Sequence, residues 1–482
     1  MNLKVISRNV GFALLVSALF MLLSVGVSLL EGMDSAFSPL LISFCITFIV
    51  GAFPFVFVRR TDRITLKDGY MIIVLSWLLS FVFGMLPYAM WGGPFTLENA
   101  WFESVSGFTA TGATILEDVE SLPRSLVFWR ASTHFIGGLG VVVFLLLIIP
   151  NSSPVRLRLT NMELSSLSKD DYRSRSNKTV SIFAGVYIGI CLLAILTYNL
   201  CGMNFFDAVC HAFSVCATGG FSSRNLSIGA FGSPLIAVVT IVFMVLASSH
   251  FGLIYMALVG RSLRPLRNPV LRAYLIALAL GTVVASISLK AGAAYATWPE
   301  AFLNGTFHVV SYASTTGFGL SDNASWPMLP CFILILCSLV CGCAGSTTGG
   351  LKVDRILALF KAIRMQISKT LHPSSMYEVR LGKRVLHDED VYPHVLYITL
   401  FILLLIISSM AALLLGDPNG HAITGSIASL GNVGPSLGSI GSMGNYNLEP
   451  TSLKILFSLD MFLGRVEIYP LFAVFSLLFK QK

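Results

Sequence analysis

Four short glycine-containing segments have the composition needed to bind a dehydrated cation. They are centred on Thr111-Gly112, Thr218-Gly219, Thr316-Gly317 and Val433-Gly434. Glycine adopts left-handed dihedral angles without steric cost, so consecutive backbone carbonyl groups can point in one direction. Rings of carbonyl oxygens can replace the hydration shell of an alkali cation. The four segments therefore predict that the backbone, rather than acidic side chains, coordinates a cation.

Each pair belongs to a longer segment that is too apolar for a solvated loop and too short to cross a bilayer. The four segments are Phe102–Leu116, Phe206–Ser223, Phe302–Ser321 and His421–Ser439. Each begins with residues compatible with a short helix and lies between two apolar spans. Non-helical backbone at membrane depth must line a cavity or be buried in protein. We therefore predict four re-entrant loops around one axis; the alternative is four tight turns between packed helices.

A fifth glycine-rich stretch interrupts an apolar span in the third quarter of the chain. It comprises Gly342, Cys343, Ala344, Gly345, Ser346, Thr347, Thr348, Gly349 and Gly350. Glycine is among the poorest helix formers, so this stretch should break the helix at membrane depth. Such a break faces a cavity, and its hydroxyl and carbonyl groups can meet a passing ion. The alternative is a flexible kink with no role in gating.

Arg465 lies within the last apolar segment of the chain. A charge at the centre of a bilayer costs several kcal/mol, so Arg465 should face a pore or a partner. Asp460 and Glu467 are close in sequence, but neither is three or four residues away on a helix. In a cation pore, Arg465 would slow permeation by repulsion. An ion pair with another helix is the alternative.

The elements that hold these residues must be membrane helices. The 482 residues are 55% hydrophobic and only 12% charged, and the mean hydropathy is +0.79. A soluble chain is closer to one quarter charged. Ten segments approach the length of about 20 apolar residues that a spanning helix needs. They are Asn9–Leu30, Ser35–Val58, Gly69–Leu97, Ala131–Val155, Thr179–Phe206, Asn225–Gly260, Ala273–Leu289, Asn323–Leu351, Val395–Gly416 and Thr451–Phe479.

The distribution of basic residues predicts the orientation of these spans. Most of the 32 Lys and Arg residues fall in the termini and in alternate connections. Cytoplasmic connections carry this excess, so both termini are predicted to be cytoplasmic. The same distribution explains the net charge of +8 without a nucleic-acid partner. We find no phosphate-binding loop and no cluster of catalytic polar residues, and therefore predict a protein that is not an enzyme.

The predicted fold is an all-α polytopic membrane protein with four membrane-pore-membrane repeats around a central pore. Two N-terminal transmembrane helices, in residues 1–67, precede the repeats. The repeats are predicted over residues 68–177, 178–268, 269–385 and 386–482, and the second helix of the third repeat is broken. A multi-pass enzyme or an assembly scaffold is the alternative from another functional class.

The sequence resembles the Trk/Ktr/HKT superfamily of potassium transporters, and most closely the bacterial Trk membrane subunit. The resemblance extends over nearly the whole chain. It is carried by the four loops and by WRASTHFIGGLG (Trp129–Gly140), CGCAGSTTGGLK (Cys341–Lys352) and MFLGRVEIYP (Met461–Pro470).

This resemblance implies potassium uptake through a selectivity filter in which a glycine of each loop favours potassium. The filter residues are implied to be Ala110-Thr111-Gly112, Ala217-Thr218-Gly219, Thr315-Thr316-Gly317 and Asn432-Val433-Gly434. Gly342–Gly350 and Arg465 are implied to form the gate below the filter. A sodium- or proton-coupled potassium symporter of the same fold remains the alternative within transport.

The resemblance also implies partners and a location. The family implies a homodimer in the bacterial cytoplasmic membrane and a cytoplasmic nucleotide-binding ring that regulates opening. Potassium ions in the pore and membrane lipid are the other expected partners, with no bound cofactor.

Overall fold

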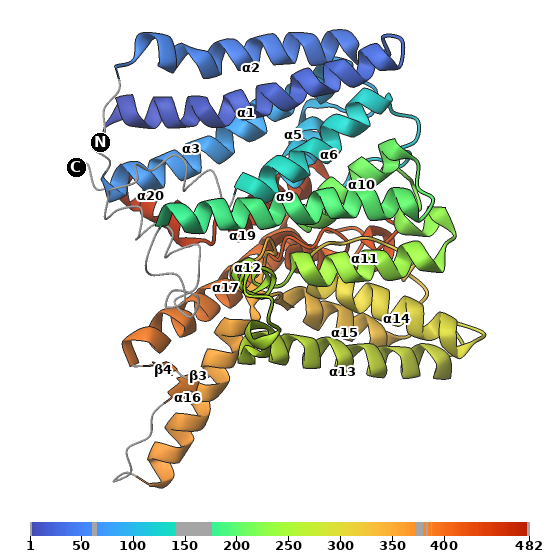
Figure 1. The fold of residues 1–482 in the computed structure, drawn as a ribbon, viewed down its shortest axis with the longest axis vertical. Helices are drawn as coiled ribbons and strands as arrows, with labels where there is room; N and C mark the ends of the chain where they lie inside the picture. The colour runs from blue at the N-terminus through green and yellow to red at the C-terminus, as the bar shows by residue number, and fades with distance from the viewer. Residues whose placement is uncertain are drawn as a thin grey trace.

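The chain folds into a layer of roughly parallel helices (Figure 1). The computed structural model describes residues 2–59, 65–140, 176–372, 379–381, 384–386 and 388–479. Six of the described helices are long and apolar enough to cross a membrane, and a bent helix pair adds a seventh. The predicted all-α membrane fold is confirmed.

The described helices fall into a longer and a shorter group. The long ones are α1 (Leu3–Leu30), α2 (Phe37–Phe57), α3 (Leu66–Gly84), α9 (Ser176–Leu200), α13 (Pro269–Ala291), α16 (Val353–Leu371) and α17 (Asp388–Leu414). The short ones are α4 (Leu86–Trp91), α5 (Leu97–Phe108), α6 (Arg124–Leu139), α10 (Phe205–Ala217), α11 (Pro234–Ala247), α12 (Phe251–Val259), α14 (Trp298–Ala313), α15 (Met328–Leu339), α18 (Ala422–Leu430), α19 (Thr451–Arg465) and α20 (Tyr469–Phe479).

Two small β pairs accompany the helices. Strand β1 (Val340–Cys341) pairs in parallel with β2 (Leu351–Lys352) and so closes the glycine-rich stretch between them into a loop. Strand β3 (Val379–Leu381) pairs antiparallel with β4 (Arg384–Leu386).

Helices α1 and α2 form a hairpin at one edge of the layer, and α3 packs on α1 (Figure 1). Glycine permits the close approach of the hairpin, because a Cβ atom on Gly11 would lie 2.6 Å from the carbonyl oxygen of Gly51. Helix α1 begins and α20 ends on the same side of the layer, where α16 also extends away from it (Figure 1).

Besides Gly69–Leu97, which is divided between α3 and α4 at Met85, three predicted spans are interrupted in the described residues, although a break was expected in only one of them. Asn323–Leu351 leaves the helix after Leu339, as expected. Asn225–Gly260 consists of α11 and α12, which meet at 99°. Thr451–Phe479 is interrupted after Arg465, where Glu467 and Ile468 adopt positive φ angles of 56° and 61°.

The backbone at the break between α11 and α12 is hydrogen-bonded to the glycine-rich loop that follows α15. The carbonyl oxygen of Ser248 accepts a hydrogen bond from Cys343 N, and Phe251 N donates to the carbonyl oxygen of Gly345. These bonds satisfy backbone groups that the break removes from the helix. A fourth predicted span, Ala131–Val155, contains the end of α6, and its part beyond residue 140 lies outside the described residues.

Candidate cation pathway

The four glycine-containing loops have the same backbone structure. Each follows a short helix, namely α5, α10, α14 or α18. After each helix a backbone N–H donates over 2.9 Å to a carbonyl oxygen in the last turns: Thr111 to Ser106, Gly219 to Ser214, Thr316 to Ser311 and Val433 to Ala428. These bonds satisfy helix C-terminal carbonyl groups that would otherwise lack partners.

A repeated pattern of left-handed residues follows. The residue before each of those donors has a positive φ: 51° at Ala110, 54° at Thr218, 53° at Thr315 and 53° at Asn432. The residue after each donor is a glycine with a positive φ: 84° at Gly112, 83° at Gly220, 73° at Gly317 and 88° at Gly434. A residue with a side chain is disfavoured in this conformation. This explains why the second of the two left-handed positions is a glycine in all four loops.

These glycines bring the four loops into a closed ring. A Cβ atom added to each would overlap a carbonyl oxygen of the next loop: Gly112 with Gly219 (2.0 Å), Gly220 with Thr316 (2.1 Å), Gly317 with Val433 (2.3 Å) and Gly434 with Thr111 (2.3 Å). The fourth loop thus contacts the first. Tight turns between separate helix pairs would not meet in this way, so the structure favours loops around one axis.

The ring corrects the predicted register of the second loop. Thr218, Gly219 and Gly220 occupy the places that Ala110, Thr111 and Gly112 occupy in the first loop. The predicted triplet Ala217-Thr218-Gly219 is therefore displaced by one residue, and Ala217 is the last residue of α10. Two glycines are adjacent here, and the approach of Thr316 to Gly220 decides which one takes the left-handed conformation.

One cavity of about 80 Å³ reaches all four loops. Its lining includes Gly112, Gly220, Gly317 and Gly434, together with Arg130. Because the four glycines that close the ring all border this space, the ring is accessible from one side of the layer.

The loop Gly342–Gly350 lies against the ends of the short helices. All nine residues are buried. Thr347 Oγ1 donates to the carbonyl oxygen of Cys216 over 3.0 Å, and Gly349 N donates to Thr315 Oγ1 over 3.1 Å. The structure therefore brings the two predicted groups of residues, ring and loop, into direct contact.

Arg465 joins this loop to the first repeat. Its Nη1 donates to the carbonyl oxygen of Thr347 over 2.8 Å, and its Nη2 donates to the carbonyl oxygen of Gly137 over 3.2 Å. Of the two acids close to it in sequence, Glu467 pairs with Arg355 over 2.5 Å and Asp460 accepts a hydrogen bond from Ser408. The guanidinium group thus connects the glycine-rich loop to the end of α6 in the interior.

Buried side chains behind the ring support it from three of the short helices. His211 Nε2 lies 2.9 Å from Ser222 Oγ, and His308 Nε2 lies 3.0 Å from the carbonyl oxygen of Ser321. In the first repeat Glu103 takes the same role and accepts a hydrogen bond from Thr114 Oγ1 over 3.0 Å. Each contact links a short helix to the segment that follows its own loop.

Arg130, for which the sequence pattern predicted no role, contacts the segments of two loops. Arg130 Nε lies 2.6 Å from Glu103 Oε1, and Nη1 donates to the carbonyl oxygen of Ser222 over 3.0 Å. Its guanidinium group also stacks 3.5 Å from the ring centroid of Phe221. In the sequence, an acid in one apolar segment and a base in another indicate such a pair, because buried charges require partners.

Comparison with known proteins identifies the family. The sequence model of the TrkH family, described as a cation transport protein, matches residues 38–482. This chain belongs to the TrkH family. The resemblance expected from the motifs is therefore confirmed, as is the prediction that the chain is not an enzyme, because TrkH is a transporter family.

Several TrkH relatives match the chain along almost its full length. The Trk system potassium uptake protein TrkH of Escherichia coli K12 is 32% identical over 99% of both chains. The protein of the same name from Halomonas elongata is 31% identical over 100% of both chains, and TrkG of Escherichia coli K12 is 30% identical over 98% of both.

The fold also matches a solved structure of a TrkH relative. The crystal structure of the potassium transporter TrkH from Vibrio parahaemolyticus aligns with a TM-score of 0.89 and 28% identity, covering 100% of both chains. With its apolar helices and its family, the chain is a multi-pass membrane protein.

Proposed function

We propose that this chain takes up potassium across the bacterial cytoplasmic membrane through a selectivity filter of four re-entrant loops. The observation that carries this proposal is the closed ring of four backbone segments with one conformation. Carbonyl groups arranged in this way can replace water around a cation that has lost its hydration shell. The short helices add the partly negative C-terminal ends of their dipoles, which favour a cation.

The proposed filter keeps the predicted residues in three loops and shifts those of the second. It comprises Ala110, Thr111, Gly112, Thr218, Gly219, Gly220, Thr315, Thr316, Gly317, Asn432, Val433 and Gly434. Potassium is proposed as the ion because relatives about one third identical over nearly the full chain are named potassium uptake proteins.

The proposed gate is Gly342–Gly350 together with Arg465. The loop contacts the second and third filter segments through Thr347 and Gly349. Arg465 holds the loop by the carbonyl oxygen of Thr347 and adds a positive charge on the proposed ion path. A barrier of this kind can open if the loop moves away from the filter while the ring remains intact.

The proposed repeats keep the boundaries 68–177, 178–268, 269–385 and 386–482, after the helix pair in 1–67. We place both termini in the cytoplasm, because the basic residues concentrate on their side. We also propose a homodimer and a cytoplasmic nucleotide-binding ring. Helix α16 suits such a partner, since it extends from that side with Phe360, Ile367 and Leu371 exposed (Figure 1).

The proposed function predicts uptake by the purified chain alone. Vesicles that contain the chain and an inside-negative potential should accumulate ⁸⁶Rb⁺, a potassium substitute, and external potassium should compete better than sodium. Protein-free vesicles are the control. Failure of the folded chain to take up the tracer, with or without cytoplasmic extract, would reject a potassium pathway.

Proton coupling is a second candidate, and Asp460 favours it. This acid is 4% exposed within α19, and it accepts a hydrogen bond from the hydroxyl of Ser408, which also contacts Ser426. No ion pair to Asp460 occurs among the described residues. A buried acid with hydroxyl partners in a membrane segment is a candidate proton site.

The coupled mechanism predicts tracer uptake driven by an imposed proton gradient without a potassium gradient. Asp460→Asn should remove that component and preserve uptake driven by membrane potential. Asp322→Asn, at an exposed acid outside the helices, is the matched control. No uptake under a proton gradient in the unmodified chain would exclude the coupled mechanism.

A further inference from the structure

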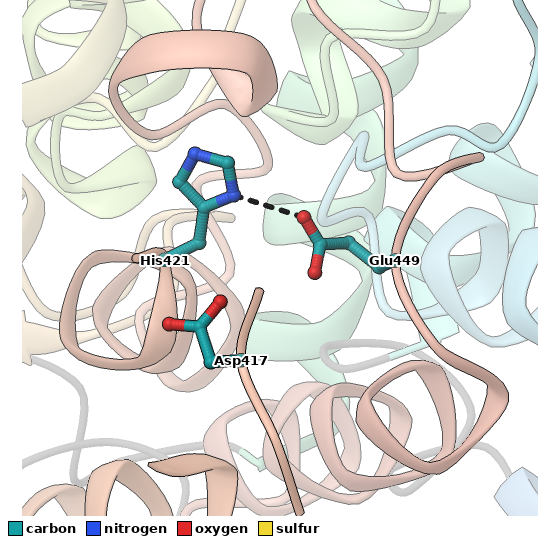
Figure 2. Close-up of side chains that lie close together, drawn as sticks. All are labelled: Asp417, His421 and Glu449. Carbon is teal, nitrogen blue, oxygen red and sulfur yellow. Dashed lines mark hydrogen bonds and ion pairs between the residues drawn. The ribbon is translucent and has the colours of Figure 1, made fainter. Parts of the chain in front are cut away.

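Three side chains near the fourth loop form a cluster that the proposed ion path does not use. Asp417 precedes α18, His421 immediately precedes its first residue, and Glu449 lies before α19 (Figure 2). One possible ligand atom from each residue lies within 4.8 Å of the others. Figure 2 shows the imidazole ring and the two carboxyl groups around a common space.

The two oxygens of Glu449 have different surroundings. Oε1 lies 2.9 Å from His421 Nδ1 and accepts a hydrogen bond from Asn419 Nδ2 over 3.0 Å. Oε2 has no hydrogen-bond partner among the described residues, although the side chain is only 1% exposed. Leaving a buried carboxylate oxygen without a partner is costly. A bound cation at Oε2 would remove that cost.

The surroundings of Asp417 and His421 also allow these side chains to bind a metal ion. Asp417 accepts hydrogen bonds from the backbone N–H groups of Asn419 over 3.2 Å and Ala422 over 2.6 Å, which orient its carboxyl group. His421 Nε2 lies 3.3 Å from Ser439 Oγ, so Nε2 can carry the proton. Nδ1, which lies 2.9 Å from Glu449 Oε1, can then bind a metal in place of that contact.

We propose that Asp417, His421 and Glu449 bind a zinc-like divalent transition metal ion near the fourth loop. One imidazole nitrogen and two carboxylate oxygens suit Zn²⁺ and leave one position for water. The nitrogen ligand favours a transition metal over Ca²⁺ or Mg²⁺, which prefer oxygen ligands.

The geometry requires only a local adjustment. Two ligand atoms of tetrahedral Zn²⁺ lie about 3.3 Å apart. His421 Nδ1 already lies 2.9 Å from Oε1 of the Glu449 carboxyl group, so a rotation of that carboxyl group would place Oε2 beside Nδ1 as the ligand. The carboxyl group of Asp417 would have to move inward by about 1 Å or more to complete the site. It lies on an exposed connection after α17, which allows such a movement.

The site is connected to the ring through Tyr446. Glu449 N donates to the carbonyl oxygen of Tyr446 over 3.2 Å, and Tyr446 Oη donates to the carbonyl oxygen of Gly434 over 2.8 Å. Tyr446 N also donates to the carbonyl oxygen of Thr114. A metal ion on Glu449 would therefore stabilise the segment that holds the fourth and first loops together.

Zn²⁺ titration of the purified full-length chain tests the proposal. Calorimetry should show one Zn²⁺ per chain, and Zn²⁺ should raise the thermal unfolding temperature. His421→Gln and Glu449→Gln should each weaken binding by on the order of tenfold or more, since each removes a ligand. Asp322→Asn is the control, because this exposed acid also accepts a backbone hydrogen bond but lies outside the cluster.

Asp417→Asn provides a variant that preserves shape, should the other two fail to fold. It should also weaken Zn²⁺ binding and abolish the thermal shift. Co²⁺ added to the unmodified chain should give the visible absorption bands of tetrahedral coordination. No stoichiometric Zn²⁺ binding, or equal affinity in the unmodified chain and in Asp417→Asn, would show that His421 and Glu449 form a structural pair only. These readouts are independent of potassium transport.

Discussion

Replacing Gly112 by serine is expected to raise sodium permeability relative to potassium by about tenfold. Gly112 has a φ of 84°, and a left-handed conformation costs a residue with a side chain roughly 1–2 kcal/mol. A Cβ atom there would also lie 2.0 Å from the carbonyl oxygen of Gly219. The added side chain therefore displaces this oxygen. A change of about 1.4 kcal/mol in the free energy of binding sodium relative to potassium alters the permeability ratio tenfold.

The ratio is measured from competition of sodium and potassium with ⁸⁶Rb⁺ uptake in vesicles. Gly189→Ser is the matched control, because no atom lies within 4 Å of a Cβ atom at that position in α9 and its φ is ordinary. Unchanged selectivity in a folded, active Gly112→Ser variant would contradict the proposed role of this loop.

Replacing Arg465 by alanine is expected to increase the rate of uptake several-fold. The change removes a positive charge from the proposed path, where repulsion of about 4 kcal/mol acts between unit charges 4 Å apart at an effective dielectric constant of 20. It also removes the hydrogen bonds to Thr347 and Gly137. The loop Gly342–Gly350 then loses a contact that holds it against the proposed filter.

Initial ⁸⁶Rb⁺ uptake measures this effect, and Arg465→Lys separates its two causes. Lysine retains the charge, but its ammonium group lacks the planar set of N–H donors with which the guanidinium group bonds both carbonyl oxygens. Intermediate uptake in Arg465→Lys would assign part of the barrier to the bridge. Arg272→Ala, at an exposed basic residue of α13, is the control. Lower uptake of Arg465→Ala together with a lower unfolding temperature would instead indicate a structural role.

The membrane class and the four loops could be predicted from the sequence, because their causes are local. Hydropathy depends only on the residues within each span, and the left-handed conformation at Gly112, Gly317 and Gly434 is one that glycine adopts without steric cost. The glycine content of 342–350 likewise predicts a break, since it disfavours a helix without reference to any neighbour.

Other features depend on contacts between distant segments. Gly219 and Gly220 are equally able to adopt a positive φ, and the backbone of Thr316 selects Gly220. The break at Ser248–His250 contains no glycine or proline and forms because Cys343 and Gly345 bond its backbone.

The partners of charged residues also required the tertiary structure. Spacing in the sequence identifies only acids on the same helix as possible partners. In the structure, Arg465 instead donates hydrogen bonds to the carbonyl oxygens of Thr347 and Gly137. His421 and Glu449 come together from either side of the fourth loop. The sequence by itself thus determined the membrane class, the loops and their glycines through local conformational preference and hydropathy. Only the tertiary structure decided the register, the additional helix breaks and the charge partners, because packing between repeats determines which groups meet.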